Sequence, residues 1–135
     1  MPVLAREHCS TSPQDMKPWG GPMWSHGRQL FCRAEHGGFV ELGFSLPKAG
    51  RYRLRVLASA APDFGIVRAA LDGEFLGTAF DLYAGRVCPA GSLELGTLEM
   101  PAGPHRLRVK AVGKNAASQG FAFGLDALDL LSPAE

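Results

Sequence analysis

Residues 51–56, RYRLRV, contain the strongest pattern in the sequence, because an arginine alternates with an apolar residue three times. A β-strand points successive side chains to opposite faces, so all three arginines would share one face and the apolar residues the other. A helix would scatter the arginines around its axis. The stretch therefore predicts a half-buried β-strand with a cationic outer face.

The same period of two recurs elsewhere along the chain, between turns. It is present in residues 39–46 and again in residues 106–111. Residues 66–71 end at Asp72-Gly73, which predicts a hairpin because glycine tolerates a positive φ. The 17 glycines and 10 prolines favour short strands, and no amphipathic helical stretch interrupts them. About nine strands at this spacing predict an all-β sandwich or barrel.

The length of the chain, 135 residues, suits a single domain over residues 1–135 with one core. A net charge of +1 gives no reason to expect nucleic acid or an anionic membrane as a partner. There is no stretch of 18 apolar residues that would span a membrane, and the N-terminus lacks the pattern of a signal peptide. We therefore expect a cytoplasmic protein or, if the sequence is excised from a larger protein, a secreted or cell-surface module.

Residues 9–27 predict a long N-terminal loop, because three prolines and two tryptophans interrupt any helical or strand period. Trp19 and Trp24 would form either a lid over the core or a platform for a ligand. Three widely spaced cysteines predict neither a zinc site nor a disulfide framework. Free thiols are expected, and a Cys9–Cys32 bridge is the alternative because both residues would flank the loop.

Several short motifs follow one another in order along the chain. They are Trp24-Ser25-x-Gly27-x-Gln29-Leu30, Gly38-Phe39-Val40-Glu41-Leu42, Ala49-Gly50-x-Tyr52-x-Leu54, Asp63-Phe64-Gly65, Leu71-Asp72-Gly73, Asp81-Leu82-Tyr83, Leu95-Gly96-x-Leu98, Ala102-Gly103-x-His105-x-Leu107 and Gly124-Leu125-Asp126. In this order they resemble the galactose-binding-like jelly rolls, in particular carbohydrate-binding modules attached to bacterial glycoside hydrolases, over about residues 5–132. The resemblance implies an all-β, two-sheet antiparallel β-sandwich (jelly roll) and an accessory, non-catalytic role.

The resemblance also implies a structural calcium ion, held where an acid near the first strand meets an acid in the last strand. The matching positions are Glu7 and Asp126. Asp126 lies between Leu125 and Ala127, and a carboxylate among apolar residues needs either hydrogen bonds or a cation. The alternative is that Asp126 caps a turn or accepts backbone N–H groups without a metal.

Every second connection in an antiparallel chain emerges at the same end, so we expect the loops at 35–38, 60–65, 81–91 and 113–120 to share one rim. The candidate ligand-binding residues are Trp24, Asp63, Phe64, Asp81, Tyr83, Lys114, Asn115 and Gln119. Aromatic rings suit the C–H face of a sugar and planar polar groups suit its hydroxyls, so the expected partner is a carbohydrate. For each residue a structural role is the alternative, because aromatic residues pack on cores and Asp and Asn satisfy turns.

We predict a non-catalytic carbohydrate-binding module, and two alternatives stay open. The first is a structural or self-assembling accessory domain that contacts a parent enzyme or another copy. The second is a glycoside-processing domain in which Asp63, Asp81 and Glu35 would supply the carboxylates. The sequence has no histidine pair with metal-binding spacing and no Gly-x-Ser-x-Gly motif, which disfavours two common classes of hydrolase.

The basic stripes at 51–55 and 106–110 are candidates for a nucleic-acid surface. They lack interleaved aromatic residues on which bases could stack. We therefore expect solvated sheet faces on which glutamates such as Glu41 and Glu94 pair with the basic side chains.

Overall fold

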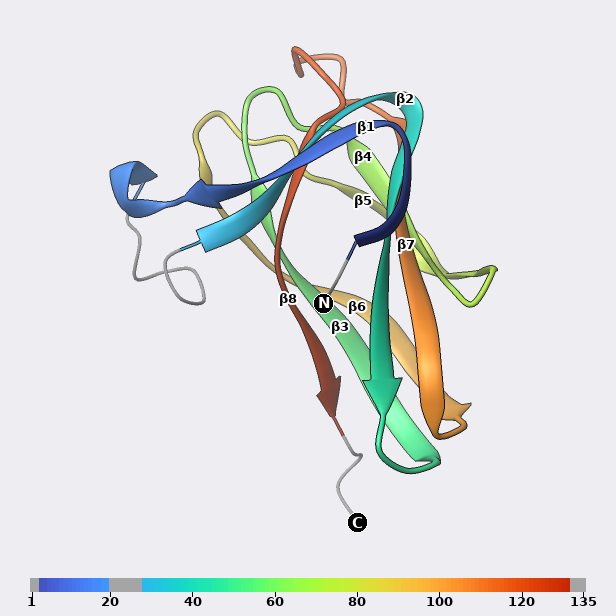
Figure 1. Ribbon diagram of the computed structural model, residues 1–135. Coiled ribbons are helices and arrows are strands. Elements are labelled where there is room, and N and C mark those ends of the chain that lie inside the picture. Colours follow the sequence, from blue (N-terminus) through green and yellow to red (C-terminus); the bar gives the residue numbers. More distant parts are fainter. Residues whose placement is uncertain (1–2, 20–27, 132–135) are drawn as a thin grey trace.

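The computed structural model describes residues 3–19 and 28–131, and strands dominate this part of the chain (Figure 1). The strands are β1 (Val3–Asp15), β2 (Arg28–Leu46), β3 (Gly50–Ala60), β4 (Ile66–Leu71), β5 (Glu74–Asp81), β6 (Cys88–Met100), β7 (Gly103–Gly113) and β8 (Phe123–Leu131). A short 3-10 helix, Lys17–Trp19, follows β1. The all-β prediction is confirmed. Within the described ranges no helix is long and apolar enough to cross a membrane.

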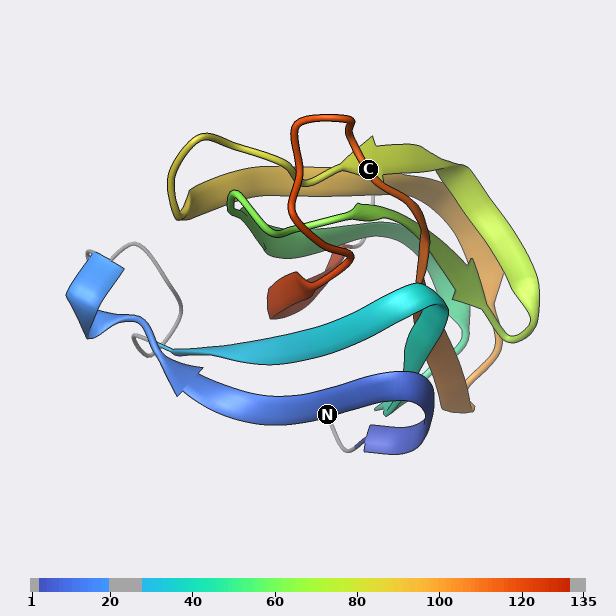
Figure 2. The same cartoon turned by 90° about the horizontal axis from the view of Figure 1, so that it is seen from above.

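Strand β2 belongs to both sheets of the sandwich. Its first half pairs with β8 through residues 30–32, and its second half pairs with β7 through residues 39–46. One sheet continues as β8-β3-β6 and the other as β7-β4-β5, with antiparallel pairing throughout. Strand β1 runs beside β2 along both halves (Figure 2). This is the expected two-sheet antiparallel sandwich, with eight strands in the described ranges.

The prediction of a loop at residues 35–38 is wrong, because β2 passes through this segment as a bent strand. A bulge in β1 accommodates the bend: His8 has a φ of 49°, and the register shifts between Glu7 and Cys9. At Gly38 the two backbones lie so close that a Cβ would be 2.3 Å from the carbonyl oxygen of His8. Glycine permits this approach, so strand pairing continues through a sequence that is typical of a turn.

The prediction of a loop over residues 9–27 is wrong for its first part, because residues 9–15 extend β1 and pair with β2 throughout. This segment is polar because it forms an edge strand, and its hydrogen bonds come from β2. Met16 then turns inward and is fully buried. Trp24 and the side chain of Trp19 lie outside the described part of the structure.

The three cysteines, including Cys88, are free thiols. Cys9 lies opposite Ala34 and Cys32 lies opposite Thr11, so the two residues occupy neighbouring positions on β1 and β2 without a bridge. Contact with the thiol of Cys32 lowers the pKa of the Cys9 thiol below its ordinary value.

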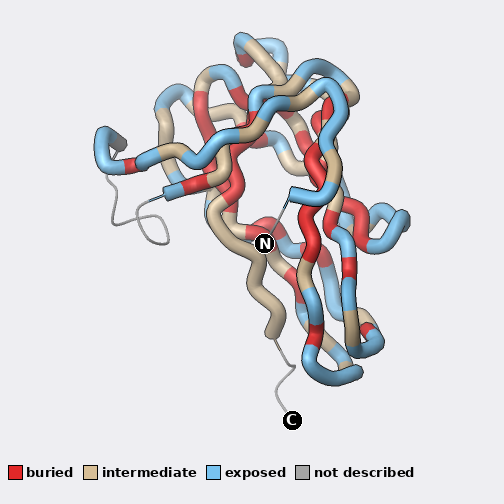
Figure 3. The backbone as a smooth tube through the Cα atoms, in the orientation of Figure 1, coloured by how far each residue is buried: buried red, intermediate tan, exposed pale blue. Residues whose placement is uncertain are grey.

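The apolar residues of the alternating strands form the core between the two sheets (Figure 3). Leu54 and Val56 of β3 are buried, and so are Leu107 and Val109 of β7. The period of two in the sequence therefore predicted the inward faces of these strands correctly.

Four basic side chains of the two stripes pair with acids, as predicted: Arg53, Arg55, Arg106 and Arg108. Both carboxylate oxygens of Glu41 accept hydrogen bonds, one from Arg106 and one from Arg108, at 3.1 Å each. On the other sheet, Arg53 of β3 pairs with Glu94 of the neighbouring strand β6. The stripes are therefore sheet faces on which most of the basic side chains are ion-paired.

Candidate functional site

Three loops interlock at one end of the sandwich, near the top of Figure 1. They join β3 to β4 (61–65), β5 to β6 (82–87) and β7 to β8 (114–122). The first loop is bonded to both others, from Ala61 N to Leu82 O (3.1 Å) and from Ala122 N to Asp63 O (3.2 Å). The expected shared rim is confirmed for these three loops.

Residues 35–38 reach the same end of the molecule as part of β2. The ring nitrogen Nε2 of His36 lies 3.0 Å from the carbonyl oxygen of Val112, and the ring stacks on Phe121 with 5.3 Å between centroids. The bend of β2 therefore packs against the loop 114–122 without adding a loop of its own.

Asp81 and Asn115 join two of the loops. The Asn115 side-chain nitrogen donates to Asp81 Oδ2 at 2.9 Å, and Asp81 Oδ1 accepts from the backbone nitrogen of Tyr83 at 3.0 Å. The side-chain oxygen of Asn115 accepts a hydrogen bond from the backbone nitrogen of Ala117 at 2.9 Å. These two predicted site residues are thus brought together, and their contacts fix the shape of the rim.

Lys114 and Gln119 also hold the loops in place. Lys114 Nζ donates to the Ser118 carbonyl oxygen at 3.2 Å, and the Gln119 backbone nitrogen donates to Pro62 O at 3.0 Å. Ser118 is buried, and its hydroxyl donates to the Phe64 carbonyl oxygen at 2.6 Å. The network leaves the loop backbone little freedom, which preorganises this end of the molecule.

The two aromatic residues predicted for the site differ in exposure. Phe64 is buried in the core, with its ring centroid 6.2 Å from that of Phe31. Tyr83 is half-buried, and its backbone bridges that of Ala61. Phe31 lies beside Phe64 and is more exposed, but the sequence analysis did not predict it as a site residue.

A small cavity of about 150 Å³ opens beside the interlocked loops. Its lining consists of Gln14, Gln29, Phe31, Ala61, Asp63, Phe64 and Val87. Asp63 and Phe64 are therefore the predicted site residues that meet at this cavity. Asp63 is exposed, and no residue in the described ranges donates a hydrogen bond to its carboxylate.

Two glutamines form the polar wall of the cavity, and sequence reasoning missed both. Gln29 is buried, accepts a hydrogen bond from Ser59 and donates from Nε2 to Gln14 Oε1 at 2.7 Å. These bonds orient Gln14 so that its own amide nitrogen keeps two N–H donors, for which the described ranges offer no acceptor. Only the pairing of β1 with β2, which sets Gln14 opposite Gln29, brings the two amides together.

The expected calcium pair, Glu7 and Asp126, is not brought together. Glu7 lies opposite Phe39 in the half of β2 that pairs with β7, with its carboxylate 4.0 Å from His8. Asp126 is the extra residue of a bulge in β8 and lies near Gln29, beside the other half of β2. No group of three or more His, Cys, Asp or Glu side chains in the described ranges could hold a metal ion. The two acids therefore do not form the expected calcium pair.

No protein-family model and no curated protein matches the sequence, whereas solved structures do. Paenibacillus xanthan lyase is similar over 98% of this chain, with a TM-score of 0.85 and 21% identity. The chain spans 12% of that enzyme. A GH26-CBM35 β-(1,4)-mannanase from Podospora anserina is similar over 97% of this chain and 26% of its own, with a TM-score of 0.61 and 13% identity.

A family 35 carbohydrate-binding module from Clostridium thermocellum is similar over nearly its whole length. The likeness covers 96% of this chain and 92% of that module, with a TM-score of 0.58 and 16% identity. At these identities the likeness concerns the fold. The chain therefore has the predicted jelly-roll fold, as these carbohydrate-binding modules do.

Proposed function

We propose that this protein is a non-catalytic carbohydrate-binding module whose saccharide site is the rim cavity. The main support for the proposal is that hydrogen-bond acceptors, hydrogen-bond donors and an apolar wall line a single cavity of about 150 Å³. The Asp63 carboxylate supplies acceptors, the Gln14 amide supplies donors, and Phe31 with Phe64 supplies an apolar wall. Neighbouring hydroxyls on a sugar need such donors and acceptors, while the C–H face of the ring needs the apolar wall.

The similar structures support this function, because several of them are themselves carbohydrate-binding modules. Others are large enzymes in which a region like this chain is a minor part, 12% of the xanthan lyase and 26% of the mannanase. An accessory module attached to a parent enzyme is therefore the role that we infer. A rigid rim fits this role, since a binding site that is already ordered loses little entropy on binding.

A non-catalytic role is favoured by the placement of the candidate acids. Hydrolysis of a glycosidic bond requires two carboxylates on either side of the bond. Within the described ranges Asp63 is the one carboxylate that lines the cavity. Asp81 is bonded to Asn115, and Glu35 lies 3.4 Å from His8 on the bent strand. The glycoside-processing alternative thus lacks a second acid at this site.

Calorimetric titration against a panel of neutral and acidic oligosaccharides tests the proposal. We expect binding by the wild-type protein, and a loss of about tenfold or more in affinity for Asp63→Ala and for Gln14→Ala, because each removes hydrogen bonds to the sugar. Arg86→Ala is the matched control, since Arg86 is exposed on the loop 82–87 and does not line the cavity. Absence of binding to every saccharide, or equal affinity in all variants, would contradict the proposal.

A further inference from the structure

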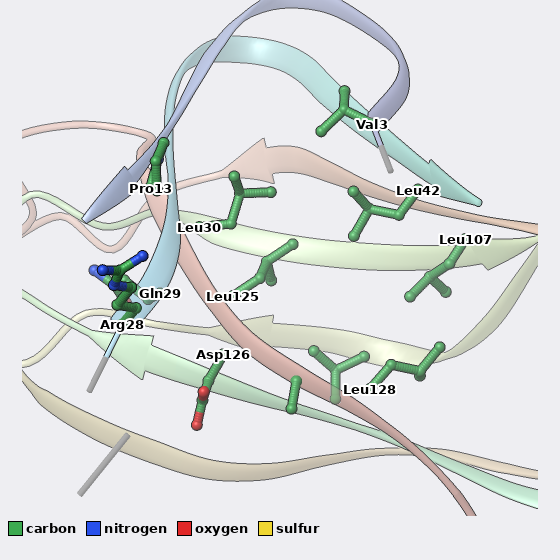
Figure 4. Close-up of a pocket in the computed structure, with 12 residues that line it drawn as sticks. Val3, Pro13, Arg28, Gln29, Leu30, Leu42, Leu107, Leu125, Asp126 and Leu128 are labelled. Atoms are coloured by element: carbon green, nitrogen blue, oxygen red, sulfur yellow. The ribbon is translucent and has the colours of Figure 1, made fainter. Parts of the chain in front are cut away.

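The sheet that contains β4 and β7 has an apolar inner face and a basic outer face. An apolar cleft of about 470 Å³ lies on the inner side, where Leu42 and Leu107 face Leu125 and Leu128 of the other sheet (Figure 4). Successive side chains of a strand point to opposite faces, so the neighbours of Leu42 and Leu107 point outward. Four basic residues lie on this outer side, and we call them the basic face: Arg68 of β4 with Arg106, Arg108 and Lys110 of β7.

Two of the four residues, Arg68 and Lys110, lie directly opposite one another on the neighbouring strands β4 and β7. Like charges in this arrangement repel one another and destabilise a sheet. Within the described ranges no acid forms an ion pair with either side chain. The two positive charges are therefore held together at a place where a bound anion would relieve their repulsion.

The acids of β1 and β2 on the same side leave the charge of the basic face positive. The carboxylate of Glu41 is shared between two arginines, because it pairs with both Arg106 and Arg108. Glu7 of β1 also lies on this side, and its carboxylate is 4.0 Å from the ring of His8. One carboxylate offsets one of the two arginines that it contacts, so the basic face carries more positive than negative charge.

Two aromatic rings hold arginines of the basic face in place. The guanidinium carbon of Arg108 lies 3.8 Å from the centroid of the Phe39 ring, and that of Arg68 lies 4.5 Å from the centroid of the Phe75 ring. Stacking on a ring fixes the plane of a guanidinium and leaves the N–H groups along its edge available. Arg68 thus presents a planar set of donors that matches the two oxygens of a carboxylate.

A hollow of about 180 Å³ beside these arginines offers hydrogen-bond acceptors as well as donors. Each oxygen of Glu41 accepts a hydrogen bond from one arginine, and a carboxylate oxygen has a further lone pair that can accept from a hydroxyl. A complementary ligand therefore carries both negative charge and hydroxyl groups. The lining of the hollow consists of Glu41, Ala70, Gly73, Phe75, Arg106 and Arg108.

We propose that the basic face is a second binding site, separate from the rim cavity, for a polysaccharide whose sugars carry carboxylate groups. The carboxylates contact Arg68 and Lys110, and neighbouring hydroxyls donate to Glu41. The phosphodiesters of DNA and the side chains of a glutamate-rich peptide offer anionic oxygens without neighbouring hydroxyls. An acidic sugar satisfies both the cations and the acceptor, and a polymer of such sugars can extend along β7.

Calorimetric titration with sodium polygalacturonate tests this inference. We expect binding that weakens as the NaCl concentration rises, because salt screens exposed charges. Arg68→Ala and Lys110→Ala should each weaken binding about threefold, and the double variant about tenfold, because each removes one exposed ionic contact. Arg51→Ala is the matched control, since it removes the same charge from an exposed position on the other sheet. It should bind like the wild-type protein.

The variant Asp63→Ala separates this inference from the saccharide site, because it alters the rim cavity and leaves the basic face intact. In this background polygalacturonate binding should persist and should still weaken with Arg68→Ala. Poly-L-glutamate, single-stranded DNA and the neutral polymer dextran should each bind about tenfold or more weakly than polygalacturonate. Loss of binding in Asp63→Ala, an equal loss in Arg51→Ala, equally tight binding of poly-L-glutamate or DNA, or no binding of polygalacturonate would each overturn the proposal.

Discussion

His105 should make the stability of this protein depend on pH, because both nitrogens of its buried ring face hydrogen-bond acceptors. Nδ1 lies 2.6 Å from Asp72 Oδ2, and Nε2 lies 2.8 Å from the Pro101 carbonyl oxygen. A neutral imidazole has one N–H, so only the protonated ring satisfies both contacts. Burial lowers the pKa of His105, but the bonds to Asp72 and Pro101 and the charge of Asp72 outweigh it and raise the pKa.

The substitution Asp72→Asn isolates this effect with little other change. Asp72 has a φ of 49°, a conformation that asparagine also tolerates. Asparagine keeps the oxygen that accepts from Arg106 N at 2.8 Å. Its amide nitrogen would instead donate to Nδ1 of His105, so the neutral ring becomes the satisfied form. The wild-type protein favours the protonated ring of His105, and the variant should therefore favour the neutral ring.

The expected loss of stability in Asp72→Asn follows from the strength of the hydrogen bond to His105 and from its exposure to water. A hydrogen bond to a charged group contributes about 1.5–3 kcal/mol to stability. The Asp72 side chain is 46% exposed, so screening by water places the expected loss near the lower end, about 1.5 kcal/mol. For a chain of 135 residues this corresponds to a fall in Tm of roughly 5 °C.

The sign of the pH dependence follows from the raised pKa. In the wild-type protein the stabilisation is fully present below the unfolded pKa of about 6.5 and is lost as the pH rises through the folded pKa. Thermal unfolding followed by circular dichroism should thus separate wild type from Asp72→Asn by roughly 5 °C at about pH 5.5, and by less at about pH 9. A difference that stays constant with pH, or an NMR titration that gives His105 a pKa below that of free histidine, would refute the reasoning.

Three further predictions concern the rim and the metal. Gly124→Ala places a Cβ 2.1 Å from Gln29 Oε1, so it should displace that buried amide and lower the free energy of unfolding in urea by about 1–3 kcal/mol. A change smaller than the error of the fit would show that Gln29 relaxes freely. Asn115→Ala removes the bond to Asp81 and should cost about 1 kcal/mol while speeding amide exchange in residues 114–119; unchanged exchange would mean that the loops do not depend on this bond. Chelation with EDTA should leave Tm unchanged, because Glu7 and its expected partner acid lie apart, and a fall that added calcium reverses would reveal a metal site elsewhere.

The sequence alone was sufficient to predict a strand or turn where the pattern of neighbouring residues specifies it. The alternation in residues 51–56 predicted which side chains of β3 face the core, and Asp72-Gly73 predicted the turn between β4 and β5. Both features depend on interactions between close neighbours in the chain, namely the pleat of a strand and the φ of a turn residue. The predicted loops 60–65, 81–91 and 113–120 also met at one rim, since antiparallel connectivity dictates which loops share an end.

Other features depended on contacts that a single strand does not encode. Residues 9–15 became a strand because β2 supplies their hydrogen bonds, although their polar composition is typical of a loop. The register between β1 and β2 then placed Gln14 opposite Gln29 and built the polar wall of the rim cavity. The same register separated Glu7 from Asp126, which the resemblance had joined around calcium. Pairing register is set by the whole sheet, so the tertiary structure alone decided which polar groups meet.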